Sequence, residues 1–190
     1  MVYMVRHGQT DWNTQNRRQG QHDILLNEIG RRQAEELAKR INDLKIDKIY
    51  TSDLSRAIET AEIINRELNK EIIIDRRIRE FDFGTVDGMF KDEITPEIRY
   101  NLEFHPEKYG AEPKYEIFKR VKSFFDELKE QNGYYLIVSH GGTLHMIMYY
   151  LLNDKDYDEN LYSEKIKKIK VNNADIFEVD LLQKTVKIYG

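Results

Sequence analysis

The segment that most constrains the fold is Val2-Tyr3-Met4-Val5-Arg6-His7-Gly8, where an apolar run ends in two basic residues and a glycine. Valine and tyrosine favour strands, and the run is far shorter than the roughly 20 apolar residues of a membrane helix. Charge also follows too soon for a signal peptide. We therefore predict a buried first strand that carries Arg6 and His7 at its carboxyl end.

Similar apolar runs alternate with amphipathic stretches along the rest of the chain. The runs predict strands near residues 2–5, 46–50, 72–74 and 134–138. Apolar positions spaced three and four residues apart predict helices at about 28–43, 53–69, 115–131 and 142–152. This alternation is typical of a three-layer α/β/α fold with a mainly parallel central sheet.

Two segments depart from this alternation. Residues 169–189 predict an antiparallel C-terminal edge of two strands around a turn-like break at 180–184. Residues 81–116 hold all three prolines, many aromatic residues and little periodicity, which predicts an irregular lid or specificity insertion. Since no repeat or linker divides the chain, we predict one domain over residues 1–190.

Charge and cysteine content narrow the class of protein. Thirty Lys and Arg residues against 34 Asp and Glu residues give a net charge of −4, with both signs mixed along the chain. That pattern is unlike a nucleic-acid-binding surface. The chain has no cysteine, which rules out disulfides and thiolate metal sites and suits a reducing cytoplasm. We predict a cytoplasmic protein with no nucleic-acid or membrane partner, and the oligomeric state stays open.

A second His-Gly unit follows a later strand: Ser139-His140-Gly141-Gly142 repeats the pattern of Arg6-His7-Gly8. Side chains beyond the carboxyl ends of neighbouring parallel strands converge on one pocket. We therefore expect His7 and His140 to share a pocket. The strand at 46–50 leads towards Arg56, and the strand at 72–74 leads towards Glu80, so both should reach the same rim.

Arginine and histidine in one pocket suit phosphoryl transfer, which needs positioning and charge stabilisation. Arg6 and Arg56 offer planar forks of donors to phosphate oxygens, and amides at the start of the Gly141 helix add positive dipole. Positive surroundings, His140 included, should lower the pKa of His7 and leave a ring nitrogen free to attack phosphorus.

The leaving oxygen also needs a proton. Glu80 is the predicted general acid, and later the base that activates water. Asp82 and Asp87 lie on the same acidic loop, and they remain alternatives for this role.

Several longer motifs accompany these single residues. They comprise Arg6-His7-Gly8-Gln9-Thr10-Asp11-Trp12-Asn13, Gln19-Gly20 with Asp23 and Leu26, Gly30 with Gln33-Ala34, the Arg56 segment at 51–61, Glu80 with Gly84 and Gly88, and the His140 segment. Together they resemble the histidine phosphatase superfamily, in the branch of cofactor-dependent phosphoglycerate mutases and broad-specificity phosphatases. The resemblance covers nearly the whole chain.

The resemblance implies a metal-independent phosphomonoester hydrolase with a phosphohistidine intermediate at His7 and no cofactor. It implies phosphate binding by Arg6, Arg56 and His140, and proton transfer by Glu80. The further substrate-binding positions that we predict are Asn13, Gln19, Gly20 and Gly141.

Three departures from the family pattern put substrate specificity in doubt. Asn27 stands where Thr or Ser is usual, and Pro113 stands where a Gly-Glu-Ser motif would place Ser. Thr85-Val86-Asp87-Gly88 replaces the commoner Trp-Glu-Gly ending. We expect these positions near the pocket rim.

Two other functions remain as alternatives. A mutase would keep its phosphoryl group away from water, and Lys91 sits where a mutase lysine would meet a second anionic group. Against it, His140 precedes Gly-Gly where mutases usually have Gly-Asn, and residues 81–116 lack paired arginines. The other alternative is a non-catalytic phospholigand-binding module, although every element of the predicted machinery is retained.

Overall fold

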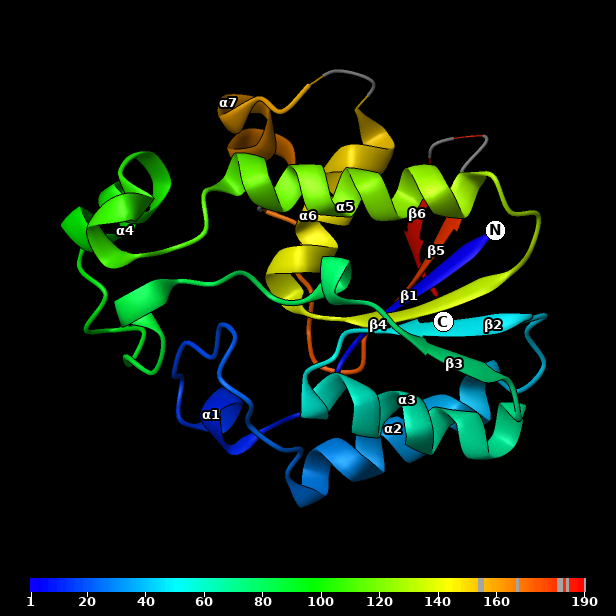
Figure 1. Cartoon of the computed structure of the whole chain (residues 1–190). Helices are drawn as coiled ribbons and strands as arrows, with labels where there is room; N and C mark the ends of the chain where they lie inside the picture. Colours follow the sequence, from blue (N-terminus) through cyan, green and yellow to red (C-terminus); the bar gives the residue numbers. More distant parts are fainter. Residues whose placement is uncertain (154–155, 167, 181–182, 184, 190) are drawn as a thin grey trace.

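A mixed β-sheet forms the centre of the molecule (Figure 1). The computed structural model describes residues 1–153, 156–166, 168–180, 183 and 185–189. Within these residues the sheet has six strands in the spatial order β3-β2-β4-β1-β5-β6. The strands are β1 (Val2–Arg6), β2 (Lys48–Thr51), β3 (Glu71–Ile74), β4 (Tyr135–Ser139), β5 (Ile176–Asp180) and β6 (Thr185–Ile188).

Five of the six described strands point the same way, and β5 runs against them. β3, β2, β4 and β1 are parallel neighbours, whereas β5 pairs antiparallel with both β1 and β6. The predicted mainly parallel sheet with an antiparallel C-terminal edge is confirmed. Of the predicted break at 180–184, residues 181, 182 and 184 lie outside the described residues.

Helices cover both faces of the sheet, which confirms the three layers (Figure 1). Helices α2 (Glu28–Ile41) and α3 (Ser55–Leu68) lie on one face, and α5 (Lys114–Lys129) and α6 (Gly141–Leu152) lie on the other. Successive strand residues alternate between these layers: Met4 packs into the core beneath α5 and α6, and Val5 packs beneath α2 and α3. Because both faces are covered, the central strands β1 and β4 are apolar over Val2–Val5 and Tyr135–Val138.

The segment predicted as an irregular insertion contains more regular structure than expected. Helix α4 (Pro96–Phe104) lies within it, together with the short 3₁₀ turns η2 (Gly84–Val86) and η3 (Pro106–Tyr109). Thr95 caps α4 through Ile98 N, and proline stands at its start, both of which favour helix initiation. Apolar periodicity gave no signal because Asn101 is the only buried residue among those of α4, all of which are described.

Short elements complete the described part of the chain. They are α1 (Asp11–Thr14), the 3₁₀ turn η1 (Arg76–Ile78), α7 (Glu159–Leu161) and the π-helical turn η4 (Tyr162–Ile166). No helix in this part of the chain has the length and apolar character needed to cross a membrane.

Candidate active site

The two predicted histidines meet at the carboxyl edge of the sheet. Arg6 pairs with Ser139 in the register of β1 and β4, and His7 N donates to Ser139 O at 3.0 Å. His7 and His140 therefore follow adjacent strands at the same level. Their ring centroids lie 5.2 Å apart, and both side chains are buried. The two rings therefore lie side by side, as expected for residues that follow adjacent strands.

A hydrogen bond fixes the tautomer of His7. Its Nδ1 lies 2.7 Å from Gly8 O, and a carbonyl oxygen can only accept, so Nδ1 carries the proton. The lone pair of the neutral ring is thus on Nε2. Gly8 is itself held by a bond from its amide to Thr60 Oγ1 at 3.1 Å. The loop after β1 therefore holds the His7 ring in one tautomer, with its lone pair on Nε2.

The surroundings keep this ring uncharged. Burial, together with the charges of Arg56 and Arg6, holds the pKa of His7 well below its usual range. Burial and the charge of Arg56 also hold the pKa of His140 well below its usual range. Both rings are neutral at physiological pH, as the nucleophile must be to attack phosphorus.

Arg56 orients His140 and remains a cation. Its Nε donates to His140 Nδ1 at 3.2 Å, while Nη1 and Nη2 donate to His22 O and Gly20 O at 2.7 Å each. Burial lowers the pKa of Arg56 to about 10, which leaves it charged. Since His140 Nδ1 accepts, the neutral His140 ring carries its proton on Nε2.

Two buried donors in this region have no hydrogen-bond partner among the described residues: His140 Nε2 and Arg6 Nε. Arg6 is anchored by a bond from Nη1 to Val171 O at 2.8 Å. A Cβ built on Gly141 would lie 3.6 Å from Arg6 Nε, so this donor faces the first residue of α6. Buried donors without partners are rare, and here they lie where an oxyanion would satisfy them.

Glu80 lies at the N-terminus of α6. Its Oε2 accepts from Gly142 N at 3.2 Å, and its Oε1 accepts from Thr143 N at 3.1 Å and from Phe81 N at 3.0 Å. These amides fix the carboxyl group beside the first turn of the helix that follows His140. The position suits proton transfer near the phosphoryl site, and it also makes Glu80 a cap of α6.

The alternative acids differ in their surroundings. Asp82 Oδ1 accepts from Gly84 N at 2.8 Å. Burial raises the pKa of Asp87 to about 7, and its Oδ1 has no hydrogen-bond partner in the described part of the chain. A carboxyl group that titrates near neutral pH can donate a proton. Asp87 therefore remains a rival to Glu80.

The loop after β1 contains the other predicted contacts. Asn13 Oδ1 accepts from Thr10 N at 3.1 Å and from Asn173 Nδ2 at 3.2 Å, and a contact between its amide nitrogen and substrate stays a prediction. Gly20 holds Arg56 through its carbonyl, in a left-handed conformation with φ of 48°. Gln19 is buried with Oε1 unpartnered within the described residues. Gly20 and Gln19 thus support the site, and their contact with substrate stays a prediction.

The departure at Asn27 is a helix cap. Asn27 Oδ1 accepts from Gly30 N at 2.9 Å, and its amide donates to Gln9 Oε1 at 3.0 Å. A Cβ on Gly30 would lie 2.1 Å from Gln9 O, so α2 begins directly against the loop after β1. Asparagine caps a helix as well as Ser or Thr does. The change at this position therefore preserves the cap.

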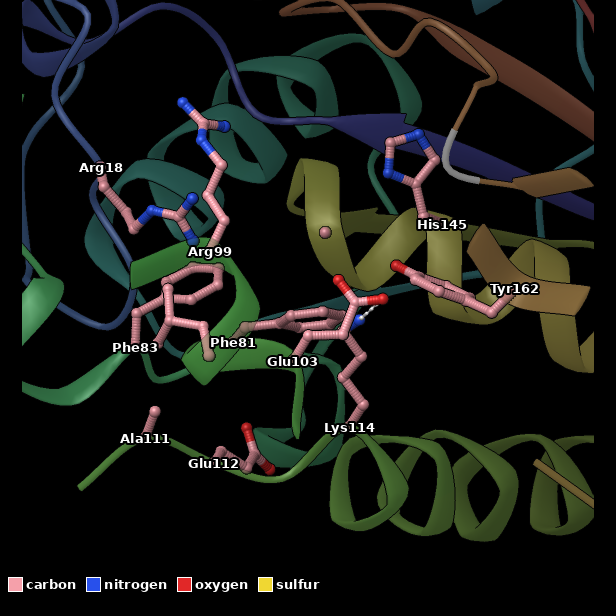
Figure 2. Close-up of a pocket in the computed structure, with 12 residues that line it drawn as sticks. Arg18, Phe81, Phe83, Arg99, Glu103, Ala111, Glu112, Lys114, His145 and Tyr162 are labelled. Atoms are coloured by element: carbon pink, nitrogen blue, oxygen red, sulfur yellow. Dashed lines mark ion pairs between the residues drawn. The ribbon is translucent and has the colours of Figure 1, made fainter. Parts of the chain in front are cut away.

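Several supporting residues gave no usable signal in the sequence. Asn173 Nδ2 donates to His7 O at 3.0 Å and to Gly8 O at 3.2 Å, yet it comes from the C-terminal segment, which reads as purely structural. Arg18 and Arg99 line a cavity of about 240 Å³ that reaches Gly142 (Figure 2). They are 81 residues apart in the chain, and each alone reads as a surface arginine.

The structure describes no group of three or more His, Asp or Glu side chains arranged to hold a metal ion. His145, outside the predicted set, lines the cavity, and its Nε2 lies 2.7 Å from Ile169 O.

Known proteins resemble this chain over nearly its full length. The family model described as histidine phosphatase superfamily (branch 1) matches residues 2–188. The chain is 35% identical over 179 residues to "Uncharacterized phosphatase PhoE" of Bacillus subtilis, covering 93% of this chain and 89% of that protein. It is 33% identical over 190 residues to "Probable phosphoglycerate mutase GpmB" of Cronobacter sakazakii, covering 96% and 85%.

Among solved structures, the phosphoserine phosphatase of Entamoeba histolytica in complex with 3-phosphoglyceric acid has a TM-score of 0.80 to this chain. The two are 26% identical, and the match covers 100% of this chain and 94% of that one.

Proposed function

This chain belongs to the histidine phosphatase superfamily, and we propose that it is a phosphatase that hydrolyses phosphomonoesters through a phosphohistidine at His7. The observation that carries the proposal is the bond from His7 Nδ1 to Gly8 O at 2.7 Å, beside the ring of His140 at 5.2 Å. It fixes a neutral imidazole, with its nucleophilic nitrogen free, next to buried cations.

Substrate binding uses the donors without partners. A phosphoryl dianion would accept hydrogen bonds from Arg6 Nε, His140 Nε2 and the amide of Gly141. Arg56 contributes charge and holds His140 in the donating tautomer. Such preorganised donors stabilise the charge of the transition state without further reorganisation.

The first chemical step transfers the phosphoryl group. His7 Nε2 attacks phosphorus, a nitrogen–phosphorus bond forms, and the bond from phosphorus to the ester oxygen breaks. Glu80 gives its proton to that oxygen, and the product leaves as an alcohol. His7 is then an N-phosphohistidine whose Nδ1–H still donates to Gly8 O, which offsets part of the new positive charge.

The second step returns the enzyme to its starting state. The ionised Glu80 takes a proton from water, and the hydroxyl oxygen attacks phosphorus. The bond to Nε2 breaks, and inorganic phosphate leaves with His7 neutral again. Proton and phosphoryl group therefore balance over the cycle.

A mutase is the second candidate, because one observation favours it. Burial lowers the pKa of Lys91, and the charges of Arg6 and Arg18 lower it further. Lys91 thus lies within electrostatic reach of the phosphoryl site and of the adjoining cavity. Incubation with 2- or 3-phosphoglycerate separates the candidates: a phosphatase releases inorganic phosphate, whereas a mutase interconverts the isomers without releasing it.

The amino-acid composition supports our proposal for the binding partners of the protein and for its location in the cell. The mixed charge of −4 and the lack of cysteine support a small phosphomonoester as substrate, the cytoplasm as the place of action and no nucleic-acid partner. One domain over residues 1–190, with a specificity insertion at 81–116, is part of the same proposal.

Substitution of the nucleophile tests the proposal. We expect His7→Ala to lower kcat on an aryl phosphate by at least about 10³-fold, because no other group replaces Nε2. With a radiolabelled substrate and an alkaline quench, wild type should carry label on histidine and His7→Ala should carry none. The assay contains chelator, since arginine and histidine supply the positive charge.

The control is His105→Ala, because the His105 side chain is half exposed and pairs with Glu107 on the lid. This variant should retain wild-type rate and label. Full activity of His7→Ala, or label on a different residue, would refute the mechanism.

A further inference from the structure

The loop between α1 and α2 holds Arg56 through two backbone carbonyls. Gly20 O and His22 O each accept from a terminal nitrogen of Arg56 at 2.7 Å. The remaining nitrogen of this guanidinium, Nε, donates to His140 Nδ1 at 3.2 Å. Gln21 stands between the two carbonyls in the chain, so a shift of Gln21 would also move the acceptors that orient Arg56.

The side chain of Gln21 reaches the segment that carries the proposed general acid. Its Nε2 donates to Glu80 O at 3.0 Å, and its Oε1 accepts from Arg79 Nη1 at 2.8 Å. The orientation of the amide is unambiguous, because a carbonyl oxygen only accepts and a guanidinium only donates. Gln21 thus makes one bond of each kind to two consecutive residues that lie 58 and 59 positions away.

The partners of Gln21 are themselves anchored. Arg79 Nε donates to Asp53 Oδ1 at 2.8 Å, and Arg79 Nη2 donates to Asp53 Oδ2 at 2.6 Å. Thr143 Oγ1, in the first turn of α6, donates to Arg79 O at 2.7 Å. The backbone amide of Gln21 donates to Asp87 Oδ2 at 3.3 Å. Gln21 therefore joins two segments that other contacts already hold in place.

Few side chains could replace that of Gln21. The two bonds need a donor and an acceptor on one terminal group, which among unbranched side chains of this length only glutamine provides. Glutamate would lose the donor, and asparagine is one methylene shorter. Glu80 O also accepts from Arg120 Nη2 at 3.2 Å, so loss of Gln21 weakens the support of this carbonyl without abolishing it.

We propose that Gln21 is a positioning residue for the reaction, which fixes the backbone of Glu80 relative to Arg56. The inference rests on the proposed function, which makes Glu80 the general acid and Arg56 a phosphoryl-binding group. The amides of α6 hold the carboxyl group of Glu80, and Gln21 adds the link to the loop that orients Arg56. Proton transfer requires the acid within hydrogen-bond reach of the leaving oxygen, and a small misplacement lowers the rate.

Gln21→Met tests this role, because methionine has a similar length and lacks the donor and the strong acceptor of the amide. kcat/KM is measured on an alkyl phosphate and on p-nitrophenyl phosphate by release of the alcohol or phenol. This parameter reports transfer of the phosphoryl group to His7 and not the later hydrolysis. An alkyl leaving group needs the proton of Glu80 in that step, whereas p-nitrophenolate does not.

We expect Gln21→Met to lower kcat/KM about tenfold on the alkyl phosphate and less than about twofold on p-nitrophenyl phosphate. Gln21→Asn should show a smaller selective loss, because it keeps an amide that is one methylene short. In the Glu80→Gln background, Gln21→Met should leave the ratio of the two kcat/KM values unchanged, because the acid that Gln21 positions is gone.

Inorganic phosphate provides a second measurement on the same variants. Its inhibition constant in Gln21→Met should stay within about twofold of wild type, because the carbonyls that hold Arg56 belong to the backbone and remain. A loss confined to proton transfer, with phosphate affinity retained, separates a positioning role from general damage to the site.

Gln131→Met is the matched control. Gln131 also makes a hydrogen bond over a long distance in the chain, since its Oε1 accepts from Tyr50 OH at 3.3 Å. It lies just before β4, at the end of the sheet away from His140. The same substitution at this position should leave both kcat/KM values unchanged.

The possible failures can be told apart. An equal loss on both substrates in Gln21→Met, or no loss on either, would overturn the positioning role. A selective loss that persists in the Glu80→Gln background would also overturn it, since Gln21 would then act on another group. If wild type releases no phosphate from either ester, the proposed function fails and the positioning role fails with it. If Gln21→Met does not fold, Gln21→Asn is judged by the same ratio.

Discussion

His7 takes its proposed role from contacts that its neighbours in sequence and in space supply together. The Gly8 carbonyl sets the tautomer, and Asn173 holds the carbonyls of His7 and Gly8. Burial and the charges of Arg56 and Arg6 set the protonation state. An isolated histidine titrates near pH 6.5 in either tautomer, so these contacts convert an ordinary imidazole into a neutral ring with one defined tautomer, as the proposed nucleophile requires.

Glu80→Gln tests the proton donor. We expect kcat on an alkyl phosphate to fall about 10²-fold or more, because an alkoxide leaving group needs a proton. The loss on p-nitrophenyl phosphate should be much smaller, since p-nitrophenolate leaves without one. Steady-state assays of the two substrates give the ratio of kcat on the alkyl phosphate to kcat on p-nitrophenyl phosphate, which should fall in Glu80→Gln. Any general loss from weaker capping of α6 affects both substrates equally.

Asp82→Asn and Asp87→Asn are the matched variants for the alternative acids. They should keep the ratio of alkyl to aryl rates close to that of wild type. A selective loss on alkyl phosphates in Asp87→Asn, with Glu80→Gln unaffected, would transfer the acid role to Asp87, whose pKa burial raises to about 7.

At the scale of elements, the site depends on where helices begin. Helix α6 begins at Gly141 and orients Glu80 through its first amides. Helix α3 carries Arg56 in its first turn. Helix α2 begins against the loop after β1, where Gly30 and Gln9 are in backbone contact. The caps of these helices therefore influence both stability and the geometry of the nucleophile loop.

Asn27→Ala tests the cap of α2. We expect the free energy of unfolding to fall by about 1 kcal/mol, since the amide of Gly30 loses its acceptor. The drop is measured by urea denaturation, with an unchanged dependence on denaturant concentration. Asn27→Ser keeps a capping oxygen and should lie within a few tenths of a kcal/mol of wild type. Equal stability of all three proteins would show that Asn27 does not stabilise α2.

At the scale of the whole molecule, the predicted lid at residues 81–116 supplies part of a cavity wall that α6 and the loop after α1 also line. Arg99 comes from α4 and Arg18 from the loop after α1, while Gly142 comes from α6. Of the lid aromatics, Phe81 is buried, whereas Tyr100 and Phe104 are 57% and 52% exposed. The lid aromatics therefore do not form one core: Phe81 and Phe83 line the cavity, and others face outward.

The protonation of Asp87 links this region to global stability. Its folded pKa of about 7 exceeds the value near 3.8 of an unperturbed carboxyl group. As pH rises, the unfolded chain releases this proton first. The stability contributed by the protonated form is therefore fully present below about pH 4 and is lost progressively up to about pH 7.

Asp87→Asn should remove the fall in stability that wild type shows as pH rises from about 4 to about 7. A complete shift of this size would amount to about 4 kcal/mol, and partial exposure of the carboxyl group screens it to about 1 to 2 kcal/mol. We expect the variant to gain that much stability over wild type between pH 4.5 and pH 8, measured by denaturant unfolding at each pH. A difference that does not change with pH would show that Asp87 is ionised without penalty.

The layers of the fold were accessible from local pattern alone. Apolar runs predicted β1 and β4, and helical spacing predicted α2, α3, α5 and α6, each within about two residues of its observed bounds. At least one face of each of these helices and strands is buried, so their apolar residues recur at a spacing that can be recognised in the sequence. Helix α4 was not predicted, because it buries little of its surface and therefore carries no apolar stripe.

The sequence by itself determined the three-layer arrangement, the family and the convergence of His7 with His140, because strand ends and short motifs are local features. Only the tertiary structure decided that Asn173 and Thr60 hold the nucleophile loop, and that Arg18 meets Arg99 across a cavity. Those contacts join residues tens to more than a hundred positions apart. The physical reason is that one side chain encodes its own chemistry, whereas its partners depend on how the whole chain packs.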